Sequence, residues 1–199
     1  QRRSLPFECY WEDSILIQEQ ERIFSNQWLG LGRADRLENP GEYEVFELCG
    51  QALVLIRDQE KALRLYANTC RHRGAKLLDG TGQCQAISCP FHGWTYSLDG
   101  NLKHAKTMSE NPSFDFAEHS LIEYKLKELQ GFLFVFLGNQ PTDLSTQLGN
   151  FSELHQPWAM NELITTRRSA FEVQCNWKAF LDVFNEYYHL NNIHPTSID

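Results

Sequence analysis

Hydrophobic and polar residues alternate through the central part of the chain. An alternation with a period of two is typical of strands that bury one face. Short turns separate the alternating runs, and "SLDGN" (97–101) is a typical hairpin turn. The runs are "EYEVFEL" (42–48), "ALVLIR" (52–57), "ALRLYA" (62–67) and "YKLKELQGFLFVFLG" (124–138). This pattern predicts a compact antiparallel β domain over residues 40–140.

A helix is expected before this domain. In "EDSILIQEQERIFSNQWLG" (12–30) the apolar residues recur at near-helical intervals. Asp13 or Ser14 could cap its N-terminus and Gly30 could end it. Residues 1–39 are therefore expected to form an N-terminal helical segment.

A change of composition follows the β domain. Residues 138–150 are rich in proline, glycine and polar side chains, which predicts a linker. An alternating strand at 165–175 and a helix from about Asn176 to Asn192 are expected after it.

Charge and composition narrow the choice of partners. The 199 residues carry a formal net charge of −8 without a block of like charges, which argues against nucleic acid as a partner. The longest apolar run, "GFLFVFLG" (131–138), is too short to span a bilayer, so we expect no membrane segment. Six cysteines are scattered through a chain too large to need disulfides, which favours a reducing cytoplasm with some cysteines as metal ligands.

Four candidate metal ligands form two short pairs. Cys70 and His72 are two positions apart, Cys89 and His92 are three apart, and each pair lies in a loop between expected strands. Buried structural thiols are the simplest alternative for the cysteines. A zinc site with two cysteines and two histidines is a stronger alternative. Against zinc, each loop mixes one cysteine with one histidine.

The two loops, "CRHRGA" and "CPFHGW", resemble the ligand loops of Rieske [2Fe–2S] proteins. In such a cluster two cysteines hold one iron and two histidines hold the other. The resemblance implies that Cys70 and Cys89 bind one iron and that His72 and His92 bind its partner. High-potential members of the superfamily have further cysteines where this chain has Ala75 and Phe91, so their loop disulfide is not expected.

Trp94 indicates the branch of the Rieske superfamily. High-potential members place a serine hydroxyl near the cluster at this position. Fewer hydrogen bonds to the cluster sulfurs stabilise its reduced state less. The substitution therefore predicts a lower reduction potential, as in the oxygenase and ferredoxin branches.

A second group of candidate ligands lies near the C-terminus. Glu186 and His189 are three residues apart and would share one face of a helix. His189 and His194 are five apart, so a helix would have to unwind or bulge between them before both could bind one metal. Two histidines and a glutamate can also simply form a polar helix face.

This segment resembles the mononuclear-iron helix of Rieske non-haem iron oxygenases, of the type that hydroxylates aromatic rings. Residues 21–28, "ERIFSNQW", also resemble the opening helix of their large, or α, subunits. The residues that match the family's iron-helix pattern are Asn176, Trp177, Lys178, Glu186, Tyr188, His189 and His194. The resemblance thus covers essentially the whole chain, through two motifs in the family's order.

The resemblance implies roles for three residues of this segment. His189 and His194 would be the imidazoles of a two-histidine, one-carboxylate iron site with open positions for dioxygen and substrate. Glu186 occupies the position of a carboxylate that links this iron to the Rieske histidine of a neighbouring subunit. Electrons would pass from His92 of one chain to Glu186 and His189 of the next, which requires a ring of subunits, as a homotrimer or an α3β3 assembly.

The family's third iron ligand is an aspartate far downstream, and Asp199 does not match it. We therefore expect these residues to be the N-terminal half, or the ordered part, of a longer subunit, inactive as an oxygenase alone. The family's acidic–asparagine pair reads Asp182-Val183 here. Glu186 stands where many ring-dihydroxylating members have aspartate. A glutamate at this position resembles members that act on quaternary ammonium compounds and some other monooxygenases.

The expected architecture is α+β. An antiparallel β Rieske domain (40–140) would be inserted after the N-terminal helical segment of the catalytic domain (1–39). A linker and the first part of a helix-grip-like catalytic domain (141–199) would follow.

The expected function is that of a terminal oxygenase component. A separate ferredoxin, NAD(P)H-dependent reductase or both would supply electrons, because no dinucleotide-binding glycine motif is present. The Rieske cluster would pass them to mononuclear Fe(II), which would activate O2 to hydroxylate or oxidatively dealkylate a small aromatic or quaternary-ammonium-like compound. A Rieske ferredoxin-type carrier with an inactive C-terminal extension is one alternative, and a zinc-stabilised binding module is another.

Overall fold

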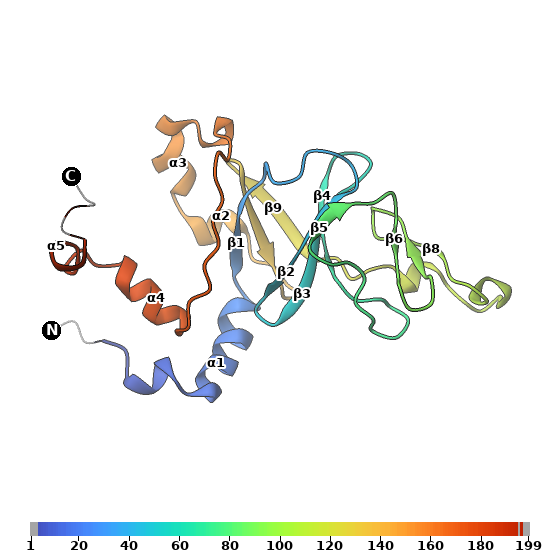
Figure 1. Ribbon diagram of the computed structural model, residues 1–199, viewed down its shortest axis with the longest axis horizontal. Coiled ribbons are helices and arrows are strands. Elements are labelled where there is room, and N and C mark those ends of the chain that lie inside the picture. The colour runs from blue at the N-terminus through green and yellow to red at the C-terminus, as the bar shows by residue number, and fades with distance from the viewer. Residues whose placement is uncertain (1–3, 195, 197–199) are drawn as a thin grey trace. The chain divides into compact units, whose positions relative to one another are not determined.

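The computed structural model describes residues 4–194 and 196. Asp199, which does not match the family's third iron ligand, lies outside these residues. The chain forms two compact units. The larger unit contains residues 22–166, and the smaller one combines residues 4–21 with the described residues from 167 onward. Both are drawn in Figure 1.

The larger unit is built from antiparallel strands, as the alternation predicts. Its four-stranded sheet has the order β4-β3-β2-β5. These strands are β2 (Glu42–Leu48), β3 (Gln51–Arg57), β4 (Leu63–Ala67) and β5 (Thr81–Gln83). On β3, Val54 and Ile56 pack into one hydrophobic cluster and Leu53 and Leu55 into another. The central strand is therefore buried on both faces, which explains its continuous apolar run.

A second sheet joins the two ends of this unit's sequence. Its order is β1-β10-β9, formed by β1 (Trp28–Arg33), β9 (Lys125–Leu129) and β10 (Phe132–Phe136). The expected helix through Gly30 is wrong in its second half, because α1 (Asp13–Glu19) gives way to a π-helical turn (Gln20–Phe24) and then to β1. Pairing of Trp28 with Phe136 on β10 outweighs the local helical spacing.

The third sheet is small and carries one of the ligand loops. It has the order β6-β7-β8, with β6 (Ile87–Ser88), β7 (Thr95–Tyr96) and β8 (Leu102–His104). Two 3-10 turns follow it, Met108–Glu110 and Ala117–His119. In Figure 1, β6 and β8 are the green strands beyond the label of β5.

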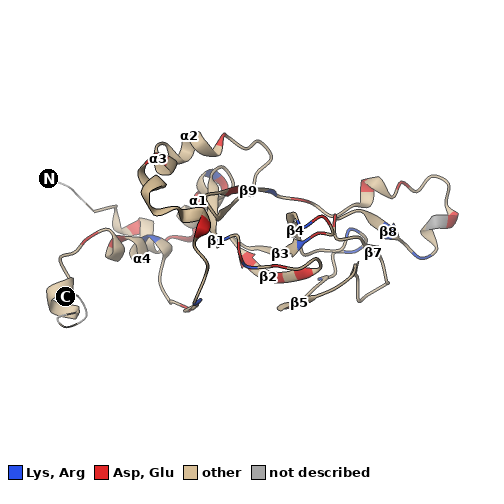
Figure 2. Ribbon diagram, turned by 90° about the horizontal axis from the view of Figure 1, so that it is seen from above, with Lys and Arg blue, Asp and Glu red and all other residues tan. Residues whose placement is uncertain are grey.

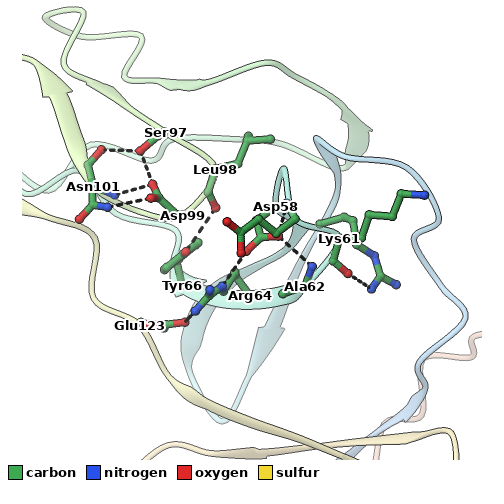
Figure 3. Close-up of polar contacts among 12 residues, drawn as sticks. Asp58, Lys61, Ala62, Arg64, Tyr66, Ser97, Leu98, Asp99, Asn101 and Glu123 are labelled. Carbon is green, nitrogen blue, oxygen red and sulfur yellow. Dashed lines mark hydrogen bonds and ion pairs between the residues drawn. The ribbon is translucent and has the colours of Figure 1, made fainter.

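Separate groups of polar contacts hold the turn after β3 and the turn after β7 (Figure 3). Buried Asp58 accepts hydrogen bonds from the backbone N–H groups of Glu60 and Ala62 and from Arg64 Nε, at 2.8 to 3.0 Å. Tyr66 donates its hydroxyl hydrogen to the Leu98 carbonyl at 3.3 Å. The turn that leads into β8 is therefore anchored to β4.

Residues expected to form a linker and a strand are arranged differently. The linker contains α2 (Leu144–Leu148), and α3 (Phe151–His155) and two 3-10 turns (Gln156–Trp158 and Met160–Glu162) follow it. The predicted strand at 165–175 is wrong: these residues are exposed, and no described strand pairs with them.

Two side chains near β1 hold the segment that leaves the larger unit. Arg33 donates to the carbonyls of Met160 and Leu163, at 2.9 and 2.5 Å. Asp35 accepts hydrogen bonds from the backbone N–H and the hydroxyl of Thr165, at 2.6 and 2.8 Å. The end of this unit is thereby fixed to its first strand.

The smaller unit is helical. Besides α1 it contains a 3-10 turn (Phe7–Tyr10), α4 (Trp177–Phe184) and α5 (Leu190–Ile193). The side chain of Asn176 caps α4 by accepting a hydrogen bond from the Lys178 N–H at 3.0 Å. The predicted continuous helix to Asn192 is wrong, because the chain leaves helical geometry between α4 and α5.

Charged residues of both signs are interspersed along the chain in Figure 2. No described helix is both long enough and apolar enough to cross a lipid bilayer.

Candidate functional site

The two ligand loops share one backbone pattern. The Cys70 N–H donates to the Ala75 carbonyl at 2.8 Å, and the Gly74 N–H returns to the Cys70 carbonyl at 3.0 Å. In the second loop, the Cys89 N–H donates to Trp94 at 2.7 Å and the Gly93 N–H to Cys89 at 3.0 Å. The two glycines have φ angles of +71° and +70°, a conformation that costs glycine little. Each loop therefore folds back over its cysteine.

The two cysteines lie beneath the loops in the hydrophobic core. Cys70 and Cys89 are 3% and 4% exposed and belong to the cluster that includes Val54 and Ile56 of β3. All six cysteines of the chain are free. Burial of two thiols under matching loops fits a group that binds thiolates.

The rings of the two histidines lie next to each other. The ring centroids of His72 and His92 are 4.7 Å apart, and His72 also stacks on the Trp94 ring at 4.7 Å. The buried Nδ1 atom of His72 has no hydrogen-bond partner in the described structure. Burial, followed by repulsion from His92, lowers the pKa of His72 and favours the neutral imidazole that binds metals. His92 is exposed.

Tyr96 contacts a candidate ligand that the sequence analysis did not connect to it. Its hydroxyl lies 3.4 Å from Cys70 Sγ and accepts the Arg71 N–H at 3.1 Å. Because the phenolic oxygen is the acceptor for Arg71, its hydrogen can point toward the sulfur. Burial and this contact raise the pKa of Tyr96, which keeps the phenol protonated. The strand pairing of Tyr96 with Ile87 on β6 sets this position, and no sequence motif signals it.

A hollow of about 410 Å³ adjoins the two histidines. Phe91 is 62% exposed, and its ring lies 3.9 Å from that of His92. The hollow is lined by His72, Phe91, His92, Trp94, Lys106, Thr107 and Met108. The histidine edge of the site is thus open, whereas its cysteine edge is closed.

No group of three or more histidine, cysteine, aspartate or glutamate side chains among residues 4–194 and 196 could hold one metal ion. A Rieske cluster does not require one, because each of its irons takes only two protein ligands. The buried thiol pair, the adjacent imidazoles and the unpartnered His72 Nδ1 therefore fit that group.

In the smaller unit, Glu186 and His189 are in direct contact. Glu186 accepts hydrogen bonds from His189 Nδ1 and from the Tyr188 and His189 backbone N–H groups. The His189 contact, opposed by burial, lowers the pKa of Glu186. The contact occurs across the break that precedes α5 rather than along a regular helix.

The same break determines how the two histidines of this unit are arranged. His189 and His194 flank the single turn of α5, with ring centroids 5.7 Å apart. The chain leaves helical geometry before His189 and again at His194, where the φ and ψ angles are −123° and 50°. Because Glu186 occupies Nδ1 of His189, the second ring nitrogen remains available as a ligand.

Comparison with protein families places both ligand groups in known domains. Residues 27–121 match the Rieske [2Fe-2S] domain, and residues 160–199 match the catalytic domain of the ring hydroxylating alpha subunit. The chain belongs to the Rieske non-haem iron oxygenases, as part of a large subunit. Members of this family use a Rieske [2Fe–2S] cluster and a mononuclear iron.

The similar proteins include several with related names. The carnitine monooxygenase oxygenase subunit of Acinetobacter baumannii is 33% identical over 98% of this chain and 54% of the relative. The glycine betaine monooxygenase oxygenase subunit of Chromohalobacter salexigens is 31% identical over 96% of this chain and 43% of the relative. This Rieske oxygenase chain therefore spans about half the length of the curated relatives it matches.

Solved structures agree in fold. A quaternary ammonium Rieske monooxygenase in complex with L-carnitine has a TM-score of 0.89 and 33% identity, over 96% of this chain and 55% of that one. Naphthalene 1,2-dioxygenase from Rhodococcus has a TM-score of 0.82 over 96% of this chain and 46% of that one. At 24% identity, the second likeness shows the fold alone. The α+β class is thus confirmed.

Proposed function

We propose that the whole protein is the terminal component of a Rieske monooxygenase that acts on a quaternary ammonium compound. The main support is that two loops with the same backbone pattern bring together Cys70, His72, Cys89 and His92. The chain's relatives are also named carnitine and glycine betaine monooxygenases. These names favour a quaternary ammonium substrate over an aromatic hydrocarbon.

The four loop residues would hold the [2Fe–2S] cluster. Cys70 and Cys89 would supply thiolates from the core, and His72 and His92 would supply imidazoles at the open edge. When bound, the cluster would supply single electrons and the mononuclear Fe(II) would activate O2 for hydroxylation or oxidative dealkylation. Packing by Trp94 and the core excludes water from the cysteine side, which leaves the histidine edge for exchange with partners.

His189 and His194 would hold the mononuclear iron, with a third carboxylate ligand from beyond this chain. Glu186 orients the His189 ring through its Nδ1 contact. We propose that Glu186 also accepts a hydrogen bond from His92 of a neighbouring subunit, so that electrons cross between chains. This arrangement implies a homotrimer or an α3β3 ring, with electrons from a ferredoxin, an NAD(P)H-dependent reductase or both.

Aromatic side chains beside Glu186 suit a quaternary ammonium substrate. Phe184, Tyr187 and Tyr188 are 68%, 81% and 91% exposed in the described structure. Ring faces attract a cation that has no hydrogen to donate, and the Glu186 carboxylate adds a negative charge. Such a surface can bind a trimethylammonium group that a purely apolar pocket would reject.

The proposed domain division has the order of the two family matches, at 27–121 and 160–199, but its bounds differ from theirs. A Rieske domain at 40–140 would separate a helical segment (1–39) from the linker and the first part of the catalytic domain (141–199). The pairing of β1 with β10 attaches residues 28–33 to the β unit as well. A cytoplasmic location remains our proposal, supported by the free cysteines.

Glu186→Gln in the holoenzyme tests the function. The amide keeps an oxygen for the backbone but loses the charge that contacts His189, so turnover of a quaternary ammonium substrate should fall at least ~10-fold. The paramagnetic spectrum of the reduced cluster should stay unchanged. Full turnover in this variant would contradict the bridging role. Wild-type holoenzyme with two irons per chain and no O2 consumption would support the electron-carrier alternative.

A further inference from the structure

The smaller unit contains a buried ion pair between its two ends. Lys178 Nζ lies 2.7 and 2.8 Å from the two carboxylate oxygens of Glu19, and the residues are only 6% and 9% exposed. Trp177 donates its indole N–H to the same carboxylate at 2.8 Å. Glu19 is the last residue of α1, and both partners stand in the first turn of α4.

We propose that Glu19 and Lys178 are positioning residues that fix the direction of α4, and with it the place of Glu186 at the iron site. This inference rests on the proposed function. The sequence alone suggests no role for Lys178. According to this inference, Lys178 supports electron transfer without contacting substrate or metal.

Stability alone does not account for such a pair. Removing two charges from water costs several kcal/mol, and replacing a buried ion pair by well-packed apolar residues is often neutral or stabilising. A buried pair does define geometry, because both charges must stay within hydrogen-bond distance. The Lys178 ammonium also lies 5.1 Å from the centre of the Trp177 ring. This cation–π contact further restricts where the ammonium can lie.

Four apolar side chains of α4 are exposed within the described residues. Phe180, Leu181, Val183 and Phe184 are each between 45% and 68% exposed. The N-terminal segment instead contacts α4 through polar groups at two points. Besides the ion pair, the Tyr10 hydroxyl donates to Asp182 Oδ2 at 2.7 Å. These two points lie about one helical turn apart, which is enough to set the axis of a short helix.

The direction of α4 matters because its C-terminal end leads directly into the bridging carboxylate. Asn185 ends the helix, and Glu186 follows it. A small rotation at Lys178 would move Glu186 relative to the neighbouring subunit's histidine. A misplacement of about 1 Å at a reacting centre can cost about a hundredfold in rate.

The test is the double variant Glu19→Gln with Lys178→Met in the holoenzyme. Glutamine keeps an acceptor for Trp177 and methionine keeps the length of lysine, so neither charge is left buried alone. We expect normal iron content and cluster potential, but about tenfold slower reoxidation of the reduced cluster by O2 and substrate. KM should not change, because neither residue meets the substrate. Lys178→Met alone should also destabilise the fold, because the buried Glu19 carboxylate then has no positive charge beside it.

A second ion pair supplies the matched control. Arg36 and Glu44 form a largely buried pair in the larger unit, and Arg36→Met with Glu44→Gln should leave reoxidation unchanged. Normal reoxidation in the Glu19–Lys178 double variant would overturn this inference. The proposed function would still stand if the wild-type enzyme is active. Wild-type holoenzyme that never reoxidises its cluster would overturn both.

Discussion

At the scale of single residues, Tyr96 changes the expected electronic setting of the cluster. The loss of a serine hydroxyl at Trp94 predicts a low potential from the sequence. The structure shows that a different hydroxyl, that of Tyr96, reaches the sulfur of Cys70. A donor to a ligand sulfur stabilises the extra negative charge of the reduced cluster. The potential therefore depends on both positions.

Tyr96→Phe should lower the reduction potential of the cluster. A hydrogen bond contributes about 1 kcal/mol, which corresponds to roughly 40 mV for a one-electron couple. Redox titration followed by electron paramagnetic resonance measures the shift. Tyr124→Phe is the control, because its hydroxyl contacts Gln51 and no candidate ligand. A Tyr96→Phe potential equal to that of the wild type would show that the 3.4 Å contact carries no hydrogen bond.

At the scale of elements, local patterns predicted those segments whose neighbours are close in sequence. The strands from 42 to 67 form hairpins, so their alternation was sufficient. β1 was missed because its partner β10 lies about a hundred residues away, and tertiary pairing decided between helix and strand. The candidate ligand residues could be named from the sequence because their spacing is local, whereas the Tyr96–Cys70 and Glu19–Lys178 contacts depend on chain folding.

The segment that leaves the larger unit should respond to acid through Asp35. The hydrogen bonds from Thr165 lower the pKa of Asp35 below its ordinary value near 3.8. The ionised Asp35 therefore contributes its full stabilisation above about pH 4. This stabilisation is lost as the pH falls through the lowered pKa of Asp35 in the folded state.

Asp35→Asn tests this contribution. The difference between wild-type and variant unfolding midpoints should be constant from pH 7 to about pH 5 and should shrink below about pH 4. Denaturant titrations at several pH values measure it. Glu128→Gln, on the exposed face of β9, controls for the removal of a surface carboxylate. If the difference in unfolding midpoint between the wild type and Asp35→Asn stays constant down to about pH 2, the effect comes from the geometry of the side chain and not from its charge.

At the scale of the whole molecule, the two ligand groups belong to different compact units of one chain. His92 of one unit and Glu186 of the other are both exposed within the described residues. In a symmetric ring, one repeated contact would bring the histidine edge of each subunit against Glu186 of the next. The proposed transfer between chains therefore makes a prediction about mixtures of inactive subunits.

Co-assembly of His92→Ala and His189→Ala chains should restore turnover that neither variant has alone. The first variant lacks a complete cluster site but keeps the mononuclear site, and the second has the reverse defect. If electrons cross between neighbours, about one junction in four of a random ring pairs an intact donor with an intact acceptor. Activity should then approach about a quarter of the wild type. Differential tags and size exclusion establish that mixed rings form. Mixed rings without activity would mean that each chain transfers electrons only within itself, because then no subunit holds both intact centres.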